Sequence, residues 1–145
     1  DVIVNDVRRR SLDLGIRFQA DFHYPESSAY DAFDVGIILQ NLLQNALEAC
    51  QKDDEGERFI MLTGKRKGRF FLIEVKNAFG GEVVFGRDGL PVTTKKEDVP
   101  MHGIGLSNVR REAEKYMGEV EIETEHHRFS VTVLLQEKRS KEEYL

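Results

Sequence analysis

The sequence has little cysteine, no long apolar run and no excess of basic charge, and each absence excludes a class of protein. A single cysteine, Cys50, excludes an internal disulfide framework and a metal site built from several cysteines. No stretch approaches the roughly 18 apolar residues of a membrane-spanning helix, and no secretory signal is present. With 21 Lys and Arg against 26 Asp and Glu, the net charge of −5 argues against a general nucleic-acid binder. We therefore expect a cytoplasmic domain with no nucleic-acid partner.

What is present fits one folded unit. The 145 residues are close to the usual length of one domain, and 40% hydrophobic with 32% charged residues is a globular composition. Neither an internal repeat nor a linker interrupts the chain, so we expect residues 1–145 to form a single domain with a frayed polar tail over 137–145. The chain begins at Asp1 and not at a methionine, from which we expect a piece of a longer protein.

Hydrophobic periodicity predicts three helices and five strands. Helical spacing covers 1–14, 34–51 and 106–116, and strand patterns cover 16–22, 59–64, 69–76, 120–122 and 129–135. Gly15 and Gly118 are expected to end the first and third helices. Because each helix has one apolar face and the strands alternate, the order predicts an α/β fold of two layers, with the helices on one face of a mixed sheet.

The strongest helical signal is the segment 34–51, which Asp34 is expected to cap. Asn41, Asn45 and Glu48 are spaced i, i+4 and i+7, so they share one face of this helix. Asparagine is a mediocre helix former, and two on one face have no propensity reason to be there. Amide oxygens can coordinate Mg²⁺, although a solvated polar face is the simpler reading of these residues alone. The opposite face is an apolar stripe of Val35, Ile38, Leu39, Leu42, Leu43, Ala46, Leu47 and Cys50.

Two further features surround a long segment with no sustained period, 78–102. A loop of that length in so small a domain is most often functional. The sequence Gly103-Ile104-Gly105-Leu106 follows it and is predicted to open a helix, whose free N–H groups attract anions. Taken alone, such a glycine pair is more often explained by a tight turn. Asn77 is predicted at the end of a strand, where its amide either reads an adenine amino edge or starts a turn.

Taken together, these segments resemble the GHKL ATP-binding superfamily. Residues 38–49 are similar to its N-box, and 93–96 followed by 102–106 are similar to its ATP lid and G2 box. The greatest similarity is to the catalytic domains of sensor histidine kinases of the quorum-sensing, peptide-responsive kind. The resemblance covers nearly the whole chain, and it implies the Bergerat ATP-binding fold, an α+β sandwich with a sheet of about five strands and three helices.

The resemblance also implies roles for single residues of the expected ATP site. Asn45 would hold Mg²⁺ against the ATP phosphates, and Asn41 would lie beside it. Asn77 falls where most members of the family carry an adenine-reading Asp in the G1 box. An Asn oxygen still accepts a hydrogen bond from the adenine amino group, and its NH₂ can donate to a ring nitrogen.

The remaining implied residues belong to the lid, about 78–102, and to the G2 box that follows it. Lys95 or Lys96 would supply positive charge to the phosphates, and His102 would lie in the lid hinge. Gly103 and Gly105 would let the backbone approach the phosphates. Their neighbours complete the expected ATP-binding set: Ile104 and Leu106.

The chain departs from the family pattern in two ways. The usual Asp-x-Gly-x-Gly of the G1 box is absent, because 77–81 reads Asn-Ala-Phe-Gly-Gly and its glycines are displaced. No phosphoacceptor histidine is evident either, since His23, His102, His126 and His127 fall in predicted strands, turns or the lid. The dimerisation domain that carries such a histidine, and any sensor region, would therefore lie upstream of this segment.

The resemblance implies a bacterial two-component protein that binds Mg-ATP and donates the γ-phosphate to a histidine on the dimerisation domain of the same protein. A response regulator would act downstream, and the parent would be a membrane-anchored homodimer. Three alternatives stay open: a degenerate nucleotide-binding or docking module without kinase activity, a GHKL serine kinase of the anti-sigma type, and an ATP hydrolase. Related hydrolases carry a Glu in place of Asn41, and an amide cannot take a proton from water at neutral pH.

Overall fold

The computed structural model describes residues 1–26, 29–52, 56–80, 83–92 and 99–137, without the side chains of 92 and 99–104. The elements follow the order α1 (Val2–Asp13), β1 (Arg17–Asp21), α2 (Ala32–Lys52), β2 (Phe59–Lys67), β3 (Phe70–Ala78), β4 (Val84–Phe85), β5 (Pro91–Val92), α3 (Val99–Glu114), β6 (Glu119–Glu125) and β7 (Arg128–Gln136). No helix within these ranges is both long enough and apolar enough to cross a bilayer.

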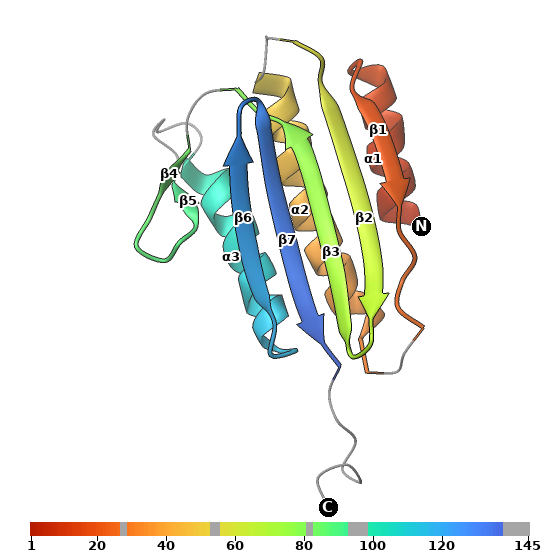
Figure 1. The fold of residues 1–145 in the computed structure, drawn as a ribbon. Helices are drawn as coiled ribbons and strands as arrows, with labels where there is room; N and C mark the ends of the chain where they lie inside the picture. Colours follow the sequence, from red (N-terminus) through yellow and green to blue (C-terminus); the bar gives the residue numbers. More distant parts are fainter. Residues whose placement is uncertain (27–28, 53–55, 81–82, 93–98, 138–145) are drawn as a thin grey trace, which may run out of the picture.

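Five strands form one mixed sheet in the order β1-β2-β3-β7-β6. β1 pairs with β2 in parallel, and the other neighbours are antiparallel. The helices α1, α2 and α3 cover the same face of this sheet (Figure 1). The two-layer fold expected from the sequence, with a five-stranded mixed sheet and three helices on one face, is therefore confirmed.

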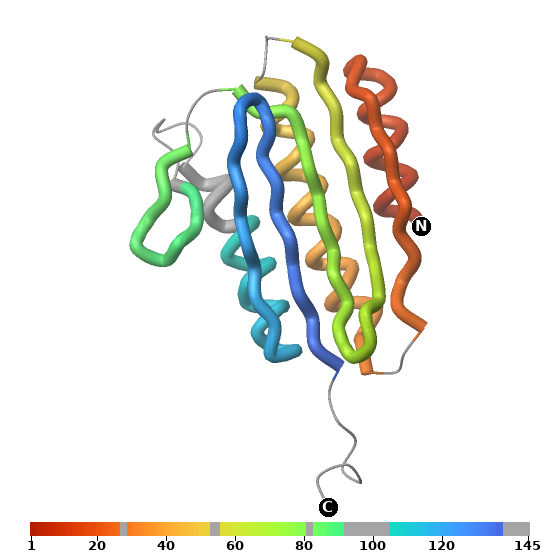
Figure 2. Tube along the Cα trace, viewed as in Figure 1, coloured from red at the N-terminus to blue at the C-terminus, as the bar shows by residue number. Residues whose placement is uncertain are grey.

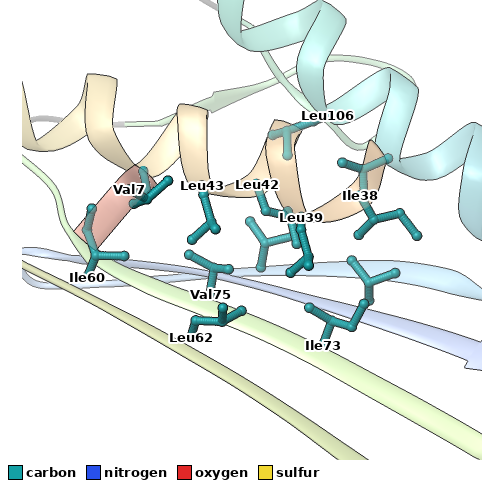
Figure 3. Packing of buried hydrophobic residues seen from close by; sticks show 14 of the residues in the cluster. Val7, Ile38, Leu39, Leu42, Leu43, Ile60, Leu62, Ile73, Val75 and Leu106 are labelled. Carbon is teal, nitrogen blue, oxygen red and sulfur yellow. The ribbon is translucent and has the colours of Figure 1, made fainter. Parts of the chain in front are cut away.

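The core lies between α2 and the middle strands of the sheet. Leu39, Leu42 and Leu43 of α2 point toward Ile73 and Val75 of β3 (Figure 3). Every residue of the predicted apolar stripe is buried: Val35, Ile38, Leu39, Leu42, Leu43, Ala46, Leu47 and Cys50. Full burial of one such aliphatic side chain stabilises the fold by about 1.5–3 kcal/mol, so this stripe fixes how α2 is rotated about its axis.

The N-terminus of α2 differs from the prediction. The helix begins at Ala32, so Asp31 is the capping residue, and its Oδ1 accepts the Phe33 N–H at 2.8 Å. Asp34 lies in the first turn instead. Its Oδ2 accepts a 2.6 Å hydrogen bond from the Tyr116 hydroxyl, which in turn accepts the Asp31 N–H at 3.0 Å. Asp31 and Asp34 are both residues of a type that caps helices, so the sequence does not distinguish them. Tyr116, which contacts both, comes near them only in the folded chain.

The start of α3 is also corrected. The helix begins at Val99 and not near Leu106, so Gly103 and Gly105 lie inside it. Glycine costs about 1 kcal/mol relative to alanine in a helix interior, which is why the sequence pattern placed the boundary after the glycines. The prediction required the N–H groups of 103–106 to be free at the start of the helix. Because α3 begins four residues earlier, these groups lie beyond its first turn and are not free.

Part of the predicted loop 78–102 has regular structure. β4 and β5 pair as a short hairpin, in which Gly86 donates its N–H to the Leu90 carbonyl at 2.8 Å. Leu90 is buried in the main core, with 3% of its surface exposed. The long loop expected over 78–102 is therefore interrupted by two short strands, Val84–Phe85 and Pro91–Val92, and the buried leucine holds their hairpin against the domain. Residues 93–98 lie outside the described part.

The end of α3 places Gly118 under a packing constraint. The helix ends at Glu114, and the left-handed position is taken by Met117, with φ 51°. A β-carbon on Gly118 would lie 1.8 Å from the Leu134 carbonyl oxygen. This glycine is therefore required by the close approach of the chain to β7, whereas the left-handed position that ends the helix, predicted for Gly118, is taken by Met117.

The turns after β2 and β6 and the end of β7 agree with the sequence only in part. β2 continues to Lys67, beyond the expected strand 59–64, so the turn before β3 is confined to 68–69. The turn expected near 125–127 is present, and His126 and His127 are exposed in it. Glu137, expected to begin a frayed tail, donates its N–H to the Arg69 carbonyl at 2.7 Å and pairs with Arg66 at 3.1 Å. The remainder of that tail, 138–145, lies outside the described residues.

Replacing Tyr116 by Phe tests the α2–α3 link. Burial, followed by the hydrogen bond to Asp34, raises the pKa of Tyr116 to about 12. A raised pKa stabilises the fold below the tyrosine's ordinary pKa of about 10, and that contribution is lost as pH rises toward 12. We expect Tyr116→Phe to lower the free energy of unfolding by about 1–3 kcal/mol at pH 7. Urea unfolding between pH 7 and 11 should show the wild type losing stability above pH 10 more steeply than the variant.

Gly118→Ala should destabilise the protein through overlap with β7. The added methyl would meet backbone atoms, which cannot rotate away, so we expect a loss of about 3 kcal/mol in the free energy of unfolding. Gly68→Ala is the matched control: its φ is +58°, but nothing lies within 4 Å of the added carbon. That variant should lose about 1 kcal/mol from backbone strain alone. Equal losses in thermal denaturation of the two variants would contradict the packing argument.

Candidate functional site

Three elements bring the predicted site residues of α2, β3 and α3 to one end of the molecule. The second half of α2 and the end of β3 lie on the same side of the domain (Figures 1 and 2), and α3 begins on that side (Figure 1). α2 packs between its two neighbours, contacting α1 on one flank and α3 on the other. Any polar residue of α2 that faces this flank is therefore held near α3.

Asn77 lies at the end of β3 and faces the helices. It pairs in register with Ile60 of β2 and Phe129 of β7, and only 1% of its surface is exposed. Its Nδ2 donates a 2.9 Å hydrogen bond to the Ala78 carbonyl. The predicted place at a strand end is confirmed, and the burial of an amide on the core-facing side is unusual enough to need a functional or structural reason.

Asn41 is oriented by its own helix. Its Nδ2 donates to the Ile37 carbonyl at 2.8 Å, which leaves Oδ1 as the end that faces away from that carbonyl. A β-carbon on Gly105 of α3 would lie 3.6 Å from Asn41 Oδ1. The structure thus brings together Asn41, from the segment similar to the N-box, and Gly105, from the segment similar to the G2 box. Because Gly105 has no side chain, there is space beside the Asn41 amide oxygen.

Asn45, one turn further along α2, is more buried than the sequence suggested. Only 9% of its surface is exposed. The simpler reading offered above, a solvated polar face, therefore does not hold for Asn45. Because α2 is packed between two other helices, the buried amide of Asn45 needs hydrogen-bond partners within the protein.

Glu48 belongs to a chain of polar contacts that the sequence analysis did not find. Gln44 Nε2 donates to Glu48 Oε1 at 3.1 Å, and Gln44 Oε1 accepts from the Arg10 guanidinium at 3.1 Å. Arg10 also lies 3.9 Å from an Asp6 oxygen within α1. The spacing of Gln44 and Glu48 signals their contact, whereas nothing in the sequence places Arg10 beside α2.

The lid and the G2 box are only partly described. Lys95 and Lys96 lie outside the described residues, and the side chains of His102 and Ile104 are not described. Gly103 lies within α3. Leu106 is buried, with 1% of its surface exposed, and packs in the core. The roles expected of these residues stay predictions.

The donor set at this end of the molecule fits Mg²⁺. Asn41, Asn45 and Glu48 offer amide and carboxylate oxygens, which are hard ligands of the kind that Mg²⁺ takes together with water and phosphate. Among the described residues no group of three or more His, Cys, Asp or Glu side chains could hold a metal ion.

Comparison with known proteins gives a family and a fold. The family model described as a GHKL domain matches residues 30–136. No curated protein sequence matches the chain.

Solved structures of histidine kinases are similar in fold. One form of the catalytic domain of histidine kinase ThkA has a TM-score of 0.65 at 18% identity, covering 94% of this chain and 93% of that one. The mycobacterial sensor histidine kinase MprB has a TM-score of 0.64 at 16% identity, covering 97% and 94%. The Acinetobacter baumannii histidine kinase AdeS has a TM-score of 0.65 at 13% identity, and the match spans 95% of this chain but 64% of AdeS.

Asn45→Ala tests the expected metal ligand. We expect the variant to bind a non-hydrolysable ATP analogue at least tenfold more weakly in the presence of Mg²⁺, because one oxygen ligand is lost. The matched control is Gln40→Ala, which removes an exposed amide from the same helix and should bind like the wild type. Calorimetric titration gives both affinities, and circular dichroism checks that each variant is folded. Wild-type affinity in Asn45→Ala would contradict the metal-binding role.

Proposed function

Because the chain belongs to the GHKL domain family, we propose that it binds Mg-ATP at the α2–α3 end of the domain and donates the γ-phosphate to a histidine on a separate domain. The observation that carries this proposal is the meeting of Asn41 with Gly105. An oriented amide oxygen on one helix faces a glycine on the next, at the side of the domain where β3 ends in a buried amide.

The chain's own residues would act by holding and orienting the nucleotide. Asn45 and Asn41 would supply neutral oxygens to a hydrated Mg²⁺ beside the phosphates, and Mg²⁺ when bound would neutralise phosphate charge. Lys95 or Lys96 would add positive charge from the lid, with His102 at its hinge. Positioning and charge stabilisation provide most of the catalysis in phosphoryl transfer, so no covalent step by the domain is needed.

The orientation of Asn41 favours transfer over hydrolysis. An amide has no basic site that could take a proton from a water molecule at neutral pH. In this structure the Asn41 NH₂ is also committed to the Ile37 carbonyl. The γ-phosphate would thus be presented to an imidazole from outside the domain, and water at this position would not be activated.

Asn77 would read the adenine base. One donor of its NH₂ is used by the Ala78 carbonyl at 2.9 Å, so the carbonyl end of the amide is the part suited to accept from the adenine amino group. Gly103 and Gly105, with Ile104 and Leu106 beside them, would line the phosphate end.

The remaining assignments concern the parent protein. The segment 1–145 would be a single catalytic domain, with a lid over about 78–102, of a sensor histidine kinase of the quorum-sensing, peptide-responsive kind. The acceptor histidine would lie on the dimerisation domain of the same protein, and a response regulator would take the phosphoryl group from it. The parent would be a bacterial, membrane-anchored homodimer with this domain in the cytoplasm.

A second candidate, a docking module without kinase activity, is favoured by the segment after Asn77. Phe79 donates its N–H to the His127 carbonyl at 3.0 Å, and its ring lies 5.7 Å from that of Phe129. Residue 79 is thus packed against β7, at a place where the family's G1 box has glycine.

Two measurements in sequence separate these candidates. Titration with a non-hydrolysable ATP analogue should give a dissociation constant between about 1 μM and 1 mM, which is about −8 to −4 kcal/mol, and Mg²⁺ should tighten it. Radiolabelled ATP should then yield an acid-labile phosphohistidine on a supplied dimerisation domain. Nucleotide binding with no transfer would favour the docking module, and no binding at millimolar nucleotide would contradict the proposal itself.

A further inference from the structure

The five-stranded sheet is covered by helices on one face only. α1, α2 and α3 all pack on the side to which the strands turn their core residues, and no helix of the described residues lies on the other side (Figure 1). Because side chains alternate along a strand, every second residue of the sheet points to this uncovered face. Leu72 of β3 and Leu134 of β7 are two of these residues, and both are half-buried. The uncovered face therefore has an apolar pair near its centre.

The row of residues that contains this pair reads basic, apolar, apolar, acidic across four neighbouring strands. Lys65 of β2 pairs with Leu72, and Leu72 pairs with Leu134. Leu134 pairs in turn with Glu119 of β6. Directly paired residues point to the same side of a sheet. Lys65 and Glu119 are both exposed, and three strand spacings of about 4.8 Å separate them by roughly 14 Å, which is too far for an ion pair within one copy.

We propose that the uncovered face binds a second copy of this chain, about a two-fold axis that runs along the strands between β3 and β7. Such an axis reverses the order of the row, so Lys65 of one copy meets the partner's Glu119 and Leu72 meets the partner's Leu134. A two-fold axis across the strands would instead place each lysine opposite its own counterpart. The charges of the row are thus complementary to themselves in the first arrangement.

The neighbouring rows of the uncovered face fit this contact. Glu74, on one side of the row, already has partners within its own copy. Thr132 Oγ1 donates to Glu74 Oε2 at 3.2 Å, and Lys76 Nζ lies 3.6 Å from Glu74 Oε1. A carboxylate with such partners costs less to remove from water than an unpaired one. On the other side of the row, Phe70 adds an aromatic ring, with 39% of its surface exposed.

The size of the uncovered face limits the strength of the association. Four strands, with about seven residues along each, give roughly 450 Å² per copy from the spacing and rise of strands. Stable interfaces bury about 800 Å² per partner, and smaller ones are weak or transient. The net charge of −5 also opposes association, although salt screens charges that are more than about 8 Å apart. We therefore expect a dissociation constant of the order of 100 μM.

The contact is independent of the function proposed above. The ATP site would lie between α2 and α3, on the face of the sheet that the helices cover (Figure 1). A second copy on the uncovered face would leave that site open in both copies, so either proposal can fail without the other.

Charge reversal at the two ends of the row tests the contact. Sedimentation equilibrium of the wild-type chain, from about 10 μM to 1 mM in about 150 mM salt, should show monomers in equilibrium with dimers. Lys65→Glu and Glu119→Lys should each weaken the dimer about tenfold or more, because each variant puts two like-charged pairs into it. The double variant restores both pairs with their signs exchanged, so its dissociation constant should return to that of the wild type.

Two further measurements make the test specific to this face. Asp13→Lys is the matched control, because it changes the net charge as much as Glu119→Lys but at an exposed position of α1, and it should dimerise like the wild type. A carbodiimide joins an amine to a carboxylate only where the two are in contact. Peptide mapping of the cross-linked wild-type dimer should therefore find Lys65 joined to Glu119, a link that the spacing within one copy does not permit.

Every result bears on the inference. A wild-type chain that stays monomeric throughout the concentration range would overturn it. A dimer that neither charge reversal weakens would also overturn it, because another surface would then hold the copies together. The same conclusion would follow if both single variants weakened the dimer and the double variant did not recover. Circular dichroism of each variant shows that a loss of dimer is not a loss of folding.

Discussion

The structure depends on how α2 is rotated against the sheet. Its apolar stripe meets the inner faces of β2 and β3, and each fully buried aliphatic side chain outweighs a typical single hydrogen bond of about 1 kcal/mol. Once Leu39, Leu42 and Leu43 are packed inward, the directions of the polar residues between them are fixed. Asn41 then faces α3, and Gln44 faces α1. The arrangement of the candidate site is a consequence of packing the core.

Backbone carbonyls orient two of the amides at this site. Asn41 donates to the Ile37 carbonyl and Asn77 to the Ala78 carbonyl. In each case a donor is used within the protein and the oxygen is the end left to face a ligand. An Asn that is fixed in this way suits a cation or an amino group and does not suit proton transfer. The chemistry proposed for the domain, binding and orientation without a protein base, follows from those two contacts.

Sequence reasoning worked where a periodic pattern coincided with burial, and it failed where the boundary depended on a distant partner. The stripe of α2 and the alternation in β7 are set by which side chains must leave water, and both were predicted. Asp34 was misassigned as a cap because Tyr116, more than eighty residues later in the chain, takes its carboxylate. The start of α3 was misplaced because two glycines reduce helix propensity, and tertiary contacts override so weak a preference.

The sequence by itself determined the two-layer fold, the inward face of α2 and the GHKL resemblance of the segments that carry Asn41, Asn45 and Asn77. These are local properties, because spacing and residue type follow directly from the order of the chain. Only the tertiary structure decided that Asn45 is buried, that Gly105 lies beside Asn41, and that Arg10 of α1 donates a hydrogen bond to Gln44 of α2. Those facts depend on how one helix packs against another. Packing brings together residues that are far apart in sequence, and no local pattern in the chain records their contact.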